Sequence, residues 1–166
     1  MLVLVTGGVR AGKSQFAQEL AQRLGGEEVS FLATAEPLDE EMRARIEQHR
    51  RARPGAWETL EVPLWVPEAL RRARFGVVVL DCLTLWVSNL MHREEAVEPQ
   101  VEALLAAWRE SGKTLVVVTN EVGMGIVPEN PLARRYRDVL GAANRQVARA
   151  AQQVYLLVAG LPLQLK

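Results

Sequence analysis

The chain has 166 residues, a length that suits one domain spanning 1–166 with a sizeable buried core. Twenty basic residues balance twenty acidic ones, which argues against a nucleic-acid-binding or membrane-binding surface. No run of about 18 uncharged apolar residues occurs, so we expect no transmembrane helix. The single cysteine, Cys82, cannot form an internal disulfide and fits a reducing, cytoplasmic location.

Short apolar runs rich in β-branched residues predict strands that are covered on both faces. These runs are MLVLVTG (1–7), EVSFLATA (28–35), FGVVVLDC (75–82), KTLVVVTN (113–120) and QVYLLVAG (153–160). Helical spacing predicts helices over 15–24, 40–53, 98–110 and 132–153, with a short strand and helix within 58–74. Asn130 and Pro131 suit the start of the last helix. This alternation predicts an α/β fold of the P-loop type, a mostly parallel sheet with helices on both faces.

The segment GGVRAGKS follows the first predicted strand and fits the phosphate-binding pattern G-x-x-x-x-G-K-[ST]. It consists of Gly7, Gly8, Val9, Arg10, Ala11, Gly12, Lys13 and Ser14. The backbone N–H groups of such a loop turn toward phosphate oxygens, and the next helix directs its positive end at the same anion. Lys13 would neutralise the β- and γ-phosphates, and Ser14 would ligate Mg²⁺. The strand before the loop and the helix after it favour this interpretation over a structural glycine turn.

Asp81 ends the apolar run VVVLDC, where a P-loop enzyme places the carboxylate that orients its metal ion. We therefore predict that Ser14 and Asp81 hold Mg²⁺ beside a nucleoside triphosphate. The sequence lacks the Asn-Lys-x-Asp guanine motif of regulatory GTPases, and the chain is short for a translocating ATPase. A small-molecule kinase remains, and the arginines of the chain suit phosphate transfer.

Several longer stretches accompany these motifs: LVTGGVRAGKS, FLATAEPLDEEMRARIEQHRRARP, DCLTLWVSNL, VTNEVGMGIVPENPLARRYRDVLGAANRQVA and VYLLVAGLPLQLK. With them the chain resembles, over nearly its whole length, the bifunctional adenosylcobinamide kinase/adenosylcobinamide-phosphate guanylyltransferases of cobalamin biosynthesis. The resemblance implies that ATP or GTP phosphorylates the aminopropanol hydroxyl of the corrinoid adenosylcobinamide. GTP then guanylylates an enzyme histidine, and the GMP passes to the corrinoid phosphate to give adenosylcobinamide-GDP. It also implies a homo-oligomer.

The resemblance places the guanylylated histidine in RIEQHRRARP, where His49 is the only histidine. Some relatives carry two adjacent histidines at this point, whereas here Gln48 precedes His49. The matched nucleotide contacts beyond the phosphate loop are Thr34, Ala35, Glu36, Arg50, Arg51, Ala52, Arg53, Glu61 and Asp81. Glu58 is an alternative to Glu61, because both acids lie in WETLEVP.

Arginines surround His49 in the sequence, at Arg43, Arg45, Arg50, Arg51 and Arg53. Their charge disfavours the imidazolium, which would lower the pKa of His49 and keep a ring lone pair available to attack phosphorus. The same guanidinium groups would attract the triphosphate and offset the charge of the departing pyrophosphate. The alternative from these residues alone is a solvated helix end. The competing hypotheses are a single-activity kinase in which His49 does nothing covalent and a non-catalytic nucleotide-binding module.

Other features each allow two interpretations. VGMG, after Asn120 and Glu121, is a substrate-facing loop or a turn. The basic start of the last helix opposes the helix dipole, so these side chains either grip a phosphate or a neighbouring subunit or lie on a solvated face. That start comprises Arg134, Arg135 and Arg137. The tryptophans Trp57, Trp65, Trp86 and Trp108 are predicted in the core or an interface, with Trp65 and Trp86 also candidates for stacking on a corrin ring. His92 is predicted on the surface after a helix.

Overall fold

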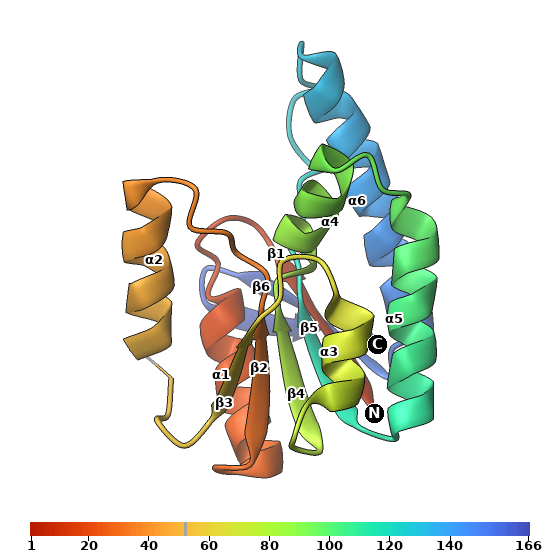
Figure 1. Ribbon diagram of the computed structural model, residues 1–166. Helices are drawn as coiled ribbons and strands as arrows, with labels where there is room; N and C mark the ends of the chain where they lie inside the picture. The colour runs from red at the N-terminus through yellow and green to blue at the C-terminus, as the bar shows by residue number, and fades with distance from the viewer. Residues whose placement is uncertain (52) are drawn as a thin grey trace.

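The computed structural model describes residues 1–51 and 53–166, except for the side chains of Arg45 and His49. Strands and helices largely alternate along this described part of the chain, with one pair of consecutive helices and one pair of consecutive strands (Figure 1). The elements are β1 (Leu2–Gly7), α1 (Lys13–Gly25), β2 (Val29–Ala33), α2 (Glu40–Arg51), β3 (Glu58–Glu61), α3 (Val66–Arg72), β4 (Val77–Asp81), α4 (Leu83–His92), α5 (Val97–Ser111), β5 (Thr114–Val118), α6 (Pro131–Ala150), β6 (Gln153–Val158) and β7 (Leu161–Gln164).

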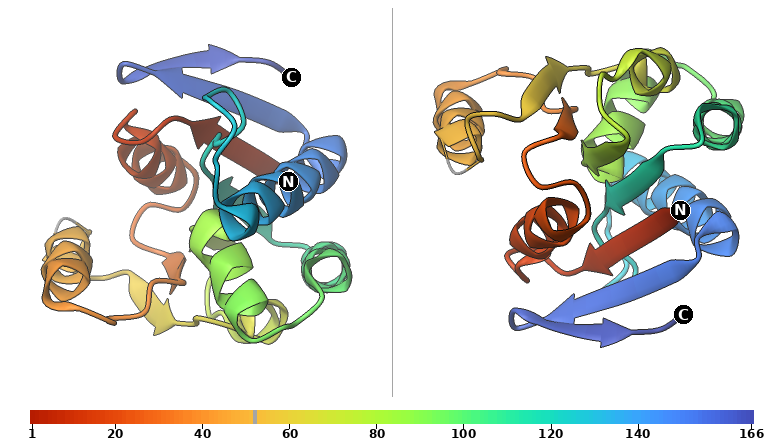
Figure 2. Two further views of the ribbon diagram at one scale, coloured as in Figure 1. Left: turned by 90° about the horizontal axis from the view of Figure 1, so that it is seen from above. Right: turned by 90° about the horizontal axis from the view of Figure 1, so that it is seen from below.

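The strands form one seven-stranded sheet in the order β3-β2-β4-β5-β1-β6-β7. Neighbouring strands are parallel from β3 through to β6, and β6 and β7 are antiparallel. Figure 2 shows the β6–β7 hairpin at one end of the sheet and β3, near α2, at the other. The prediction of a mostly parallel sheet is confirmed, and β1 lies inside it, so the loop after β1 begins in the interior of the sheet.

Side chains of a strand point alternately to the two faces of the sheet, and helices pack on both faces. On one face, Leu80 and Leu115 are fully buried against the helices α3 to α6, together with Trp86. On the other face, Phe31 packs in a smaller cluster with Ala17 of α1. The predicted covering of both faces is therefore confirmed, with the larger core on the side of α3 to α6.

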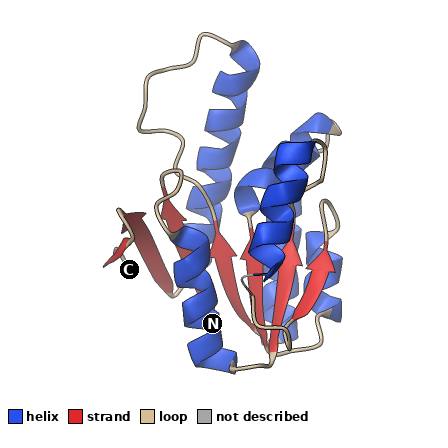
Figure 3. Ribbon diagram, turned by 90° about the vertical axis from the view of Figure 1, so that its left-hand side faces the viewer, coloured by secondary structure: helices blue, strands red, loops and turns tan. Residues whose placement is uncertain are grey.

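Helix α2 stands beside the sheet rather than flat against it (Figures 1 and 3). Its start is fixed by Asp39, whose carboxylate accepts a hydrogen bond from the N–H of Met42 at 2.7 Å. Among its described side chains, only Met42 and Ile46 are partly buried, and the others are exposed. The few apolar residues of this charged helix therefore form its contact with the rest of the protein.

Strand β7 was not predicted from the sequence, and all four of its residues are exposed. It contains Pro162, which lacks an N–H group and is tolerated at the edge of a sheet. A segment of only four residues that includes a proline predicts a strand weakly. Residues 161–164 form a strand because they pair with β6.

Helix α6 projects beyond the sheet, and the loop 119–130 rises beside it (Figures 1 and 3). Asn130 caps the helix as predicted, because its side-chain oxygen accepts from the N–H groups of Leu132 at 2.8 Å and Ala133 at 3.1 Å. Arg134 donates to the Glu129 carbonyl at 2.6 Å, and Arg137 donates to the Gly123 carbonyl at 2.8 Å. These two arginines thus hold the loop against its own helix.

Candidate active site

The phosphate loop joins the inner strand β1 to helix α1. Gly7 has a φ of 152° and Gly12 has a φ of 91°, backbone conformations that residues with a Cβ rarely adopt. A Cβ on Gly7 would lie 2.5 Å from the carbonyl oxygen of Leu157 in β6, so the close approach of the two strands requires glycine there. The loop therefore leads the chain through a tight turn into the N-terminus of α1, where backbone N–H groups attract anions.

Lys13 is the first residue of α1, and only 8% of it is exposed. Its Nζ donates to the carbonyl oxygen of Gly8 at 2.5 Å, which holds the side chain back over the phosphate loop. Burial lowers the pKa of Lys13, while the neighbouring Cys82 and Asp81 act in the opposite direction. The ammonium group thus lies where it can neutralise phosphates bound by the loop.

A cavity of about 230 Å³ lies between α1, the carboxyl ends of the inner strands and α2. Its polar lining includes Lys13, Ser14, Arg53, Asp81 and Asn120. Its apolar lining includes Phe31, Ala33, Ala35, Met42, Ile46, Leu85 and Val118. Ligands of open parallel sheets bind at the carboxyl ends of the strands, which is where this cavity lies. We call it the phosphate cavity, because the predicted phosphate-binding lysine and the predicted metal-orienting carboxylate meet there.

Arg53 reaches the phosphate cavity from the segment after α2. Its guanidinium carbon lies 4.0 Å from the centre of the Phe31 ring, and its Nη1 donates to the hydroxyl of Thr59 at 3.2 Å. Burial lowers the pKa of Arg53, and Asp81 has the opposite effect. A guanidinium remains charged in proteins, so Arg53 adds a second positive charge to the cavity.

Helix α4 fastens the strand ends that border the phosphate cavity. The side-chain amide of Asn89 donates to the carbonyl oxygens of Thr34 at 2.8 Å and Pro63 at 2.9 Å. The buried hydroxyl of Thr34 donates to the carbonyl of Cys82 and accepts from its N–H group, both at 2.8 Å. The predicted nucleotide contact Thr34 therefore joins the end of β2 to the end of β4 through its side chain.

The two candidate stacking tryptophans lie in different environments. Trp86 is fully buried, and its Nε1 donates to the Leu64 carbonyl at 2.7 Å, so its ring cannot receive a corrin and that suggestion is wrong. Trp65 is 65% exposed at the start of α3. It lines a hollow of about 520 Å³ along β3, which we call the β3 groove, together with Arg50 and Glu61.

Glu61 lines the β3 groove, and its alternative Glu58 lies at the other end of β3. Glu61 ends β3 on the side of the phosphate cavity, and its charge acts on the pKa of Arg53. Glu58 lies at the start of β3, where its carboxylate accepts from the Ser30 hydroxyl at 2.5 Å and from the Arg74 N–H at 2.9 Å. The structure thus gives Glu58 partners within the fold and leaves Glu61 beside the candidate site.

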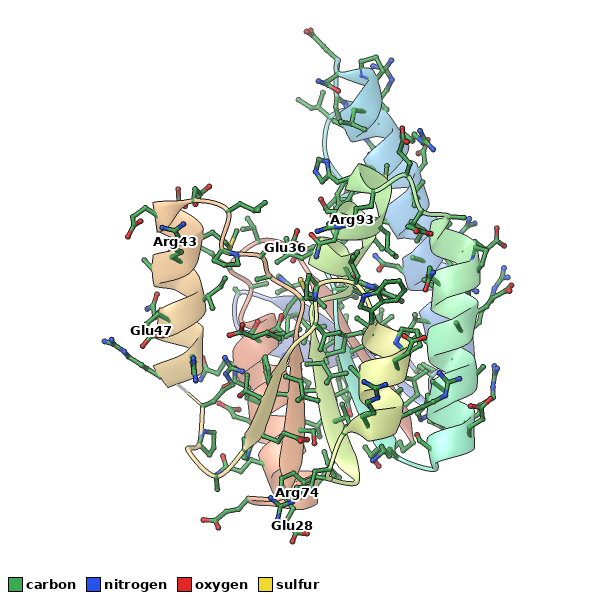
Figure 4. The ribbon with its side chains drawn as sticks, in the orientation of Figure 1. Glu28, Glu36, Arg43, Glu47, Arg74 and Arg93 are labelled. Atoms are coloured by element: carbon green, nitrogen blue, oxygen red, sulfur yellow. The ribbon has the colours of Figure 1, made fainter. Side chains whose placement is uncertain are left out.

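Two other predicted nucleotide contacts, Glu36 and Arg51, form ion pairs. Glu36 pairs with Arg93 at 2.7 Å, as Figure 4 shows, and Arg51 pairs with Glu47 at 2.9 Å. Arg43, another arginine close to His49 in sequence, pairs with Glu40 at 3.2 Å. Acidic neighbours therefore offset part of the positive charge predicted around the histidine. His49 belongs to α2, but its side chain, like that of Arg45 and like the whole of Ala52, lies outside the described residues.

The donors in the phosphate cavity suit Mg²⁺. No group of three or more His, Cys, Asp or Glu side chains that could hold a metal occurs among the described residues. Magnesium in nucleotide enzymes needs only one or two protein oxygen ligands, since phosphates and water complete its shell. Ser14 and Asp81, which line the same cavity, can supply these oxygens.

The sequence did not single out several residues that line the cavity. Phe31 points inward from β2, and Met42 and Ile46 of α2 close the outer side. In the sequence, Asn120 only precedes VGMG, the segment interpreted as a substrate-facing loop or a turn. Its signal was its place as the second polar residue after the apolar strand β5, which neighbours the strand of Asp81.

No helix in the described part of the chain is long and apolar enough to cross a membrane.

The sheet order, the phosphate loop and the acidic end of β4 define a P-loop nucleotide-binding fold. The structure resembles the flagellar accessory protein FlaH from Methanocaldococcus jannaschii with a TM-score of 0.58 and 18% identity, covering 99% of this chain and 77% of FlaH. It resembles a KaiC-like protein from Pyrococcus horikoshii OT3 with a TM-score of 0.53 and 18% identity, covering 93% of this chain and 71% of the other. At these identities the likeness concerns the fold alone.

Sequence relatives identify the family. Residues 3–165 match the CobU family model, described as cobinamide kinase / cobinamide phosphate guanyltransferase. The chain is 40% identical to the bifunctional adenosylcobalamin biosynthesis protein CobU of Escherichia coli K12, with full coverage of both chains. It is 42% identical to the corresponding CobP of Pseudomonas aeruginosa PAO1, covering 98% of this chain and 96% of that protein. The chain therefore belongs to the CobU family of enzymes, which confirms the resemblance noted in its sequence.

Proposed function

We propose that this protein phosphorylates adenosylcobinamide and then transfers GMP from GTP to the product through a covalent intermediate on His49. The observation that carries the proposal is the phosphate cavity itself. It joins Lys13, Ser14, Asp81 and Arg53 in one space whose outer side is closed by α2, the helix that contains His49.

In the kinase step, the aminopropanol oxygen of adenosylcobinamide attacks the γ-phosphorus of ATP or GTP. The bond from that phosphorus to the β–γ bridging oxygen breaks, the nucleoside diphosphate leaves, and the hydroxyl proton is released. Lys13 and Arg53 stabilise the negative charge that the transferring group carries. Bound Mg²⁺, held by Ser14 and Asp81, supplies further charge neutralisation at the phosphates.

In the guanylyl step, a ring nitrogen of His49 attacks the α-phosphorus of GTP, and pyrophosphate leaves. An oxygen of the corrinoid phosphate then attacks the same phosphorus, the N–P bond breaks, and adenosylcobinamide-GDP forms with His49 restored. The covalent intermediate means that only one anionic partner approaches the phosphorus in each step. The arginines close to His49 in sequence supply the positive charge that keeps its ring neutral, and Arg43 and Arg51 contribute less of it because each pairs with an acid on α2.

Intact-mass measurement after incubation with Mg²⁺ and GTP tests the proposal. We expect an acid-labile adduct of the mass of GMP in the wild type and none in His49→Ala. His92→Ala is the matched control, since His92 is the other histidine of the chain and lies exposed at the end of α4. It should form the adduct normally, and an adduct in His49→Ala would contradict the proposed intermediate.

The same experiment separates the alternatives. Phosphorylation of adenosylcobinamide without any adduct would identify a single-activity kinase. Nucleotide binding without any change in the corrinoid would identify a binding module. Titration of the His49 ring by NMR adds a direct check, because a ring that is cationic at neutral pH in the ligand-free protein cannot act as the nucleophile.

A further inference from the structure

Asn120 lines the phosphate cavity, although no phosphate-binding motif includes it. It follows β5, the strand next to β4, and Asp81 at the end of β4 is in register with Val118. Asn120 therefore lies just beyond the level of Asp81 along the edge of the sheet where the cavity opens. An uncharged amide at this place can donate hydrogen bonds to a phosphate oxygen without changing the charge of the cavity.

The backbone of Asn120 is held on both sides by side chains. Its N–H group donates to the hydroxyl of Thr84 in α4 at 2.7 Å. Its carbonyl oxygen accepts from the side-chain amide of Asn144 in α6 at 3.1 Å. Two helices that are far apart in sequence thus hold the peptide groups on the two sides of the Asn120 Cα.

Further hydrogen bonds hold Asn144 and Thr84, the two residues that contact the Asn120 backbone. The Thr119 hydroxyl donates to the side-chain oxygen of Asn144 at 2.7 Å. The Tyr136 hydroxyl donates to the Thr84 carbonyl at 2.9 Å, and burial raises the pKa of Tyr136, which keeps it a donor. Thr84 and Thr119 are both buried. A buried polar network in which the members find partners is rigid, so the position of Asn120 relative to Asp81 is well defined.

We propose that Asn120 is a catalytic residue of the kinase step, in which its side-chain N–H contacts an oxygen of the transferring γ-phosphoryl group. Thr84 and Asn144 are positioning residues that act through it. This inference rests on the proposed function. In the guanylyl step the bond that breaks is at the α-phosphorus, and the γ-phosphate leaves intact within pyrophosphate. Asn120 therefore contributes mainly to the first reaction, which distinguishes it from Lys13, required by both.

Asn120→Leu tests the contact, because it keeps the approximate size of the side chain and removes the donor without adding a charge to the phosphate cavity. We expect the kcat for phosphorylation of adenosylcobinamide to fall about 100-fold, a loss of the size seen when one donor to a reacting group is removed. The KM for the nucleotide and the rate of GMP adduct formation should each change less than about threefold. Asn130→Asp is a control outside the phosphate cavity, since aspartate also caps helices well, and both activities should stay at the wild-type level.

The outcomes separate this inference from the proposed function. An unchanged kinase kcat in Asn120→Leu, or an equal loss in both reactions, overturns the role of Asn120 while the two activities of the wild type stand. If the wild type phosphorylates adenosylcobinamide but forms no adduct, only the proposed guanylyl step is wrong. The comparison of kinase rates then still decides the role of Asn120. A wild type without kinase activity overturns both.

Thr84 provides the test of positioning. Thr84→Val removes the acceptor of the Asn120 N–H group, and we expect the kinase kcat to fall about tenfold with little change in the nucleotide KM. Thr84→Ser keeps the hydroxyl and should restore kcat to within about twofold of the wild type. Asn144→Asp, which removes the donor to the Asn120 carbonyl, gives a second variant should Thr84→Val fold poorly. Failure of Thr84→Ser to restore kcat, or normal kinase activity in Thr84→Val and Asn144→Asp, would overturn the positioning role.

Discussion

The carboxylate of Glu36 lies 2.7 Å from a guanidinium nitrogen of Arg93 and joins the segment after β2 to the end of α4. Arg93 also donates to the carbonyl oxygen of Asn89 at 3.4 Å, so the guanidinium group is held from two sides. Glu36 lies between β2 and α2, on the connection that leads to the helix of His49. The ion pair therefore restrains the path by which α2 is attached to the sheet.

Arg93→Gln should slow formation of the GMP adduct severalfold, because the connection to α2 loses this restraint. The free energy of unfolding should fall by at most about 1 kcal/mol, since the arginine side chain is 41% exposed and water screens such pairs. Thermal unfolding and the adduct rate check these two effects. Arg71→Gln removes the Arg71–Glu110 pair on the distant surface of α3 and α5 and should leave the adduct rate unchanged. Equal slowing in both variants would show a general effect of lost charge.

Lys13 should make the stability of the protein depend on pH in the alkaline range. Burial lowers the pKa of Lys13 in the folded protein, so below its ordinary value of about 10.5 the unfolded chain holds more protons at this site. The free energy of unfolding then gains a contribution that rises with pH toward that value. Urea unfolding of the wild type and Lys13→Met at several alkaline pH values should show this rise only in the wild type. Parallel curves for the two proteins would contradict it.

Nucleotide binding should raise the pKa of Lys13 again. Triphosphate oxygens favour the charged ammonium group of Lys13, so binding at alkaline pH should take up protons. Calorimetric titration with GTP in two buffers of different ionisation enthalpy measures this uptake. Lys13→Met should show less proton uptake and should lose most of both reactions, because both need the triphosphate in place. Normal guanylylation in that variant would mean that the two reactions do not share the phosphate loop.

Cys82 should react slowly with alkylating reagents. Burial raises the pKa of this thiol to about 12, and the neighbouring Asp81 acts in the same direction. At pH 8 only about one thiol in ten thousand would then be the reactive thiolate. We expect iodoacetamide to label the native protein at least about 100-fold more slowly than the protein unfolded in urea. Similar rates in the two states would show that the thiol is not shielded.

Arg53 should act through its charge rather than its bulk. Arg53→Met keeps an unbranched stem against Phe31 but removes the guanidinium group, and we expect both reactions to slow by about 100-fold. Phe31→Leu keeps the charge and an apolar contact and removes only the ring face, a loss of about 1 kcal/mol at most. Steady-state rates and thermal unfolding of the two variants separate these effects. A greater loss of rate in Phe31→Leu would assign the main role to the ring.

The parts of the site that the sequence predicted are those formed by residues close together in the sequence. The phosphate loop, with Lys13 and Ser14, lies in one short motif between a strand and a helix, and Asp81 ends the inner strand β4. The cap of α6 at Asn130 was predictable for the same reason, because its partners lie two and three residues away.

The parts that escaped prediction depend on distant segments. Glu36 pairs with Arg93, 57 residues away, and sequence spacing could not show this contact. Met42 and Ile46 are isolated apolar residues in a charged helix, and only the tertiary fold shows that they border the phosphate cavity. Sequence spacing also could not show that Arg134 and Arg137 hold the loop before their own helix.

The amide of Asn89 and the indole of Trp86 attach α4 to the ends of β2 and β3, so the loops after these strands have little part in keeping the strands in register. The segment between β2 and β3, which includes α2 and His49, can therefore be exchanged for that of a relative without loss of strand alignment. A scaffold that separates strand alignment from loop identity is well suited to engineering a changed choice of nucleotide or acceptor.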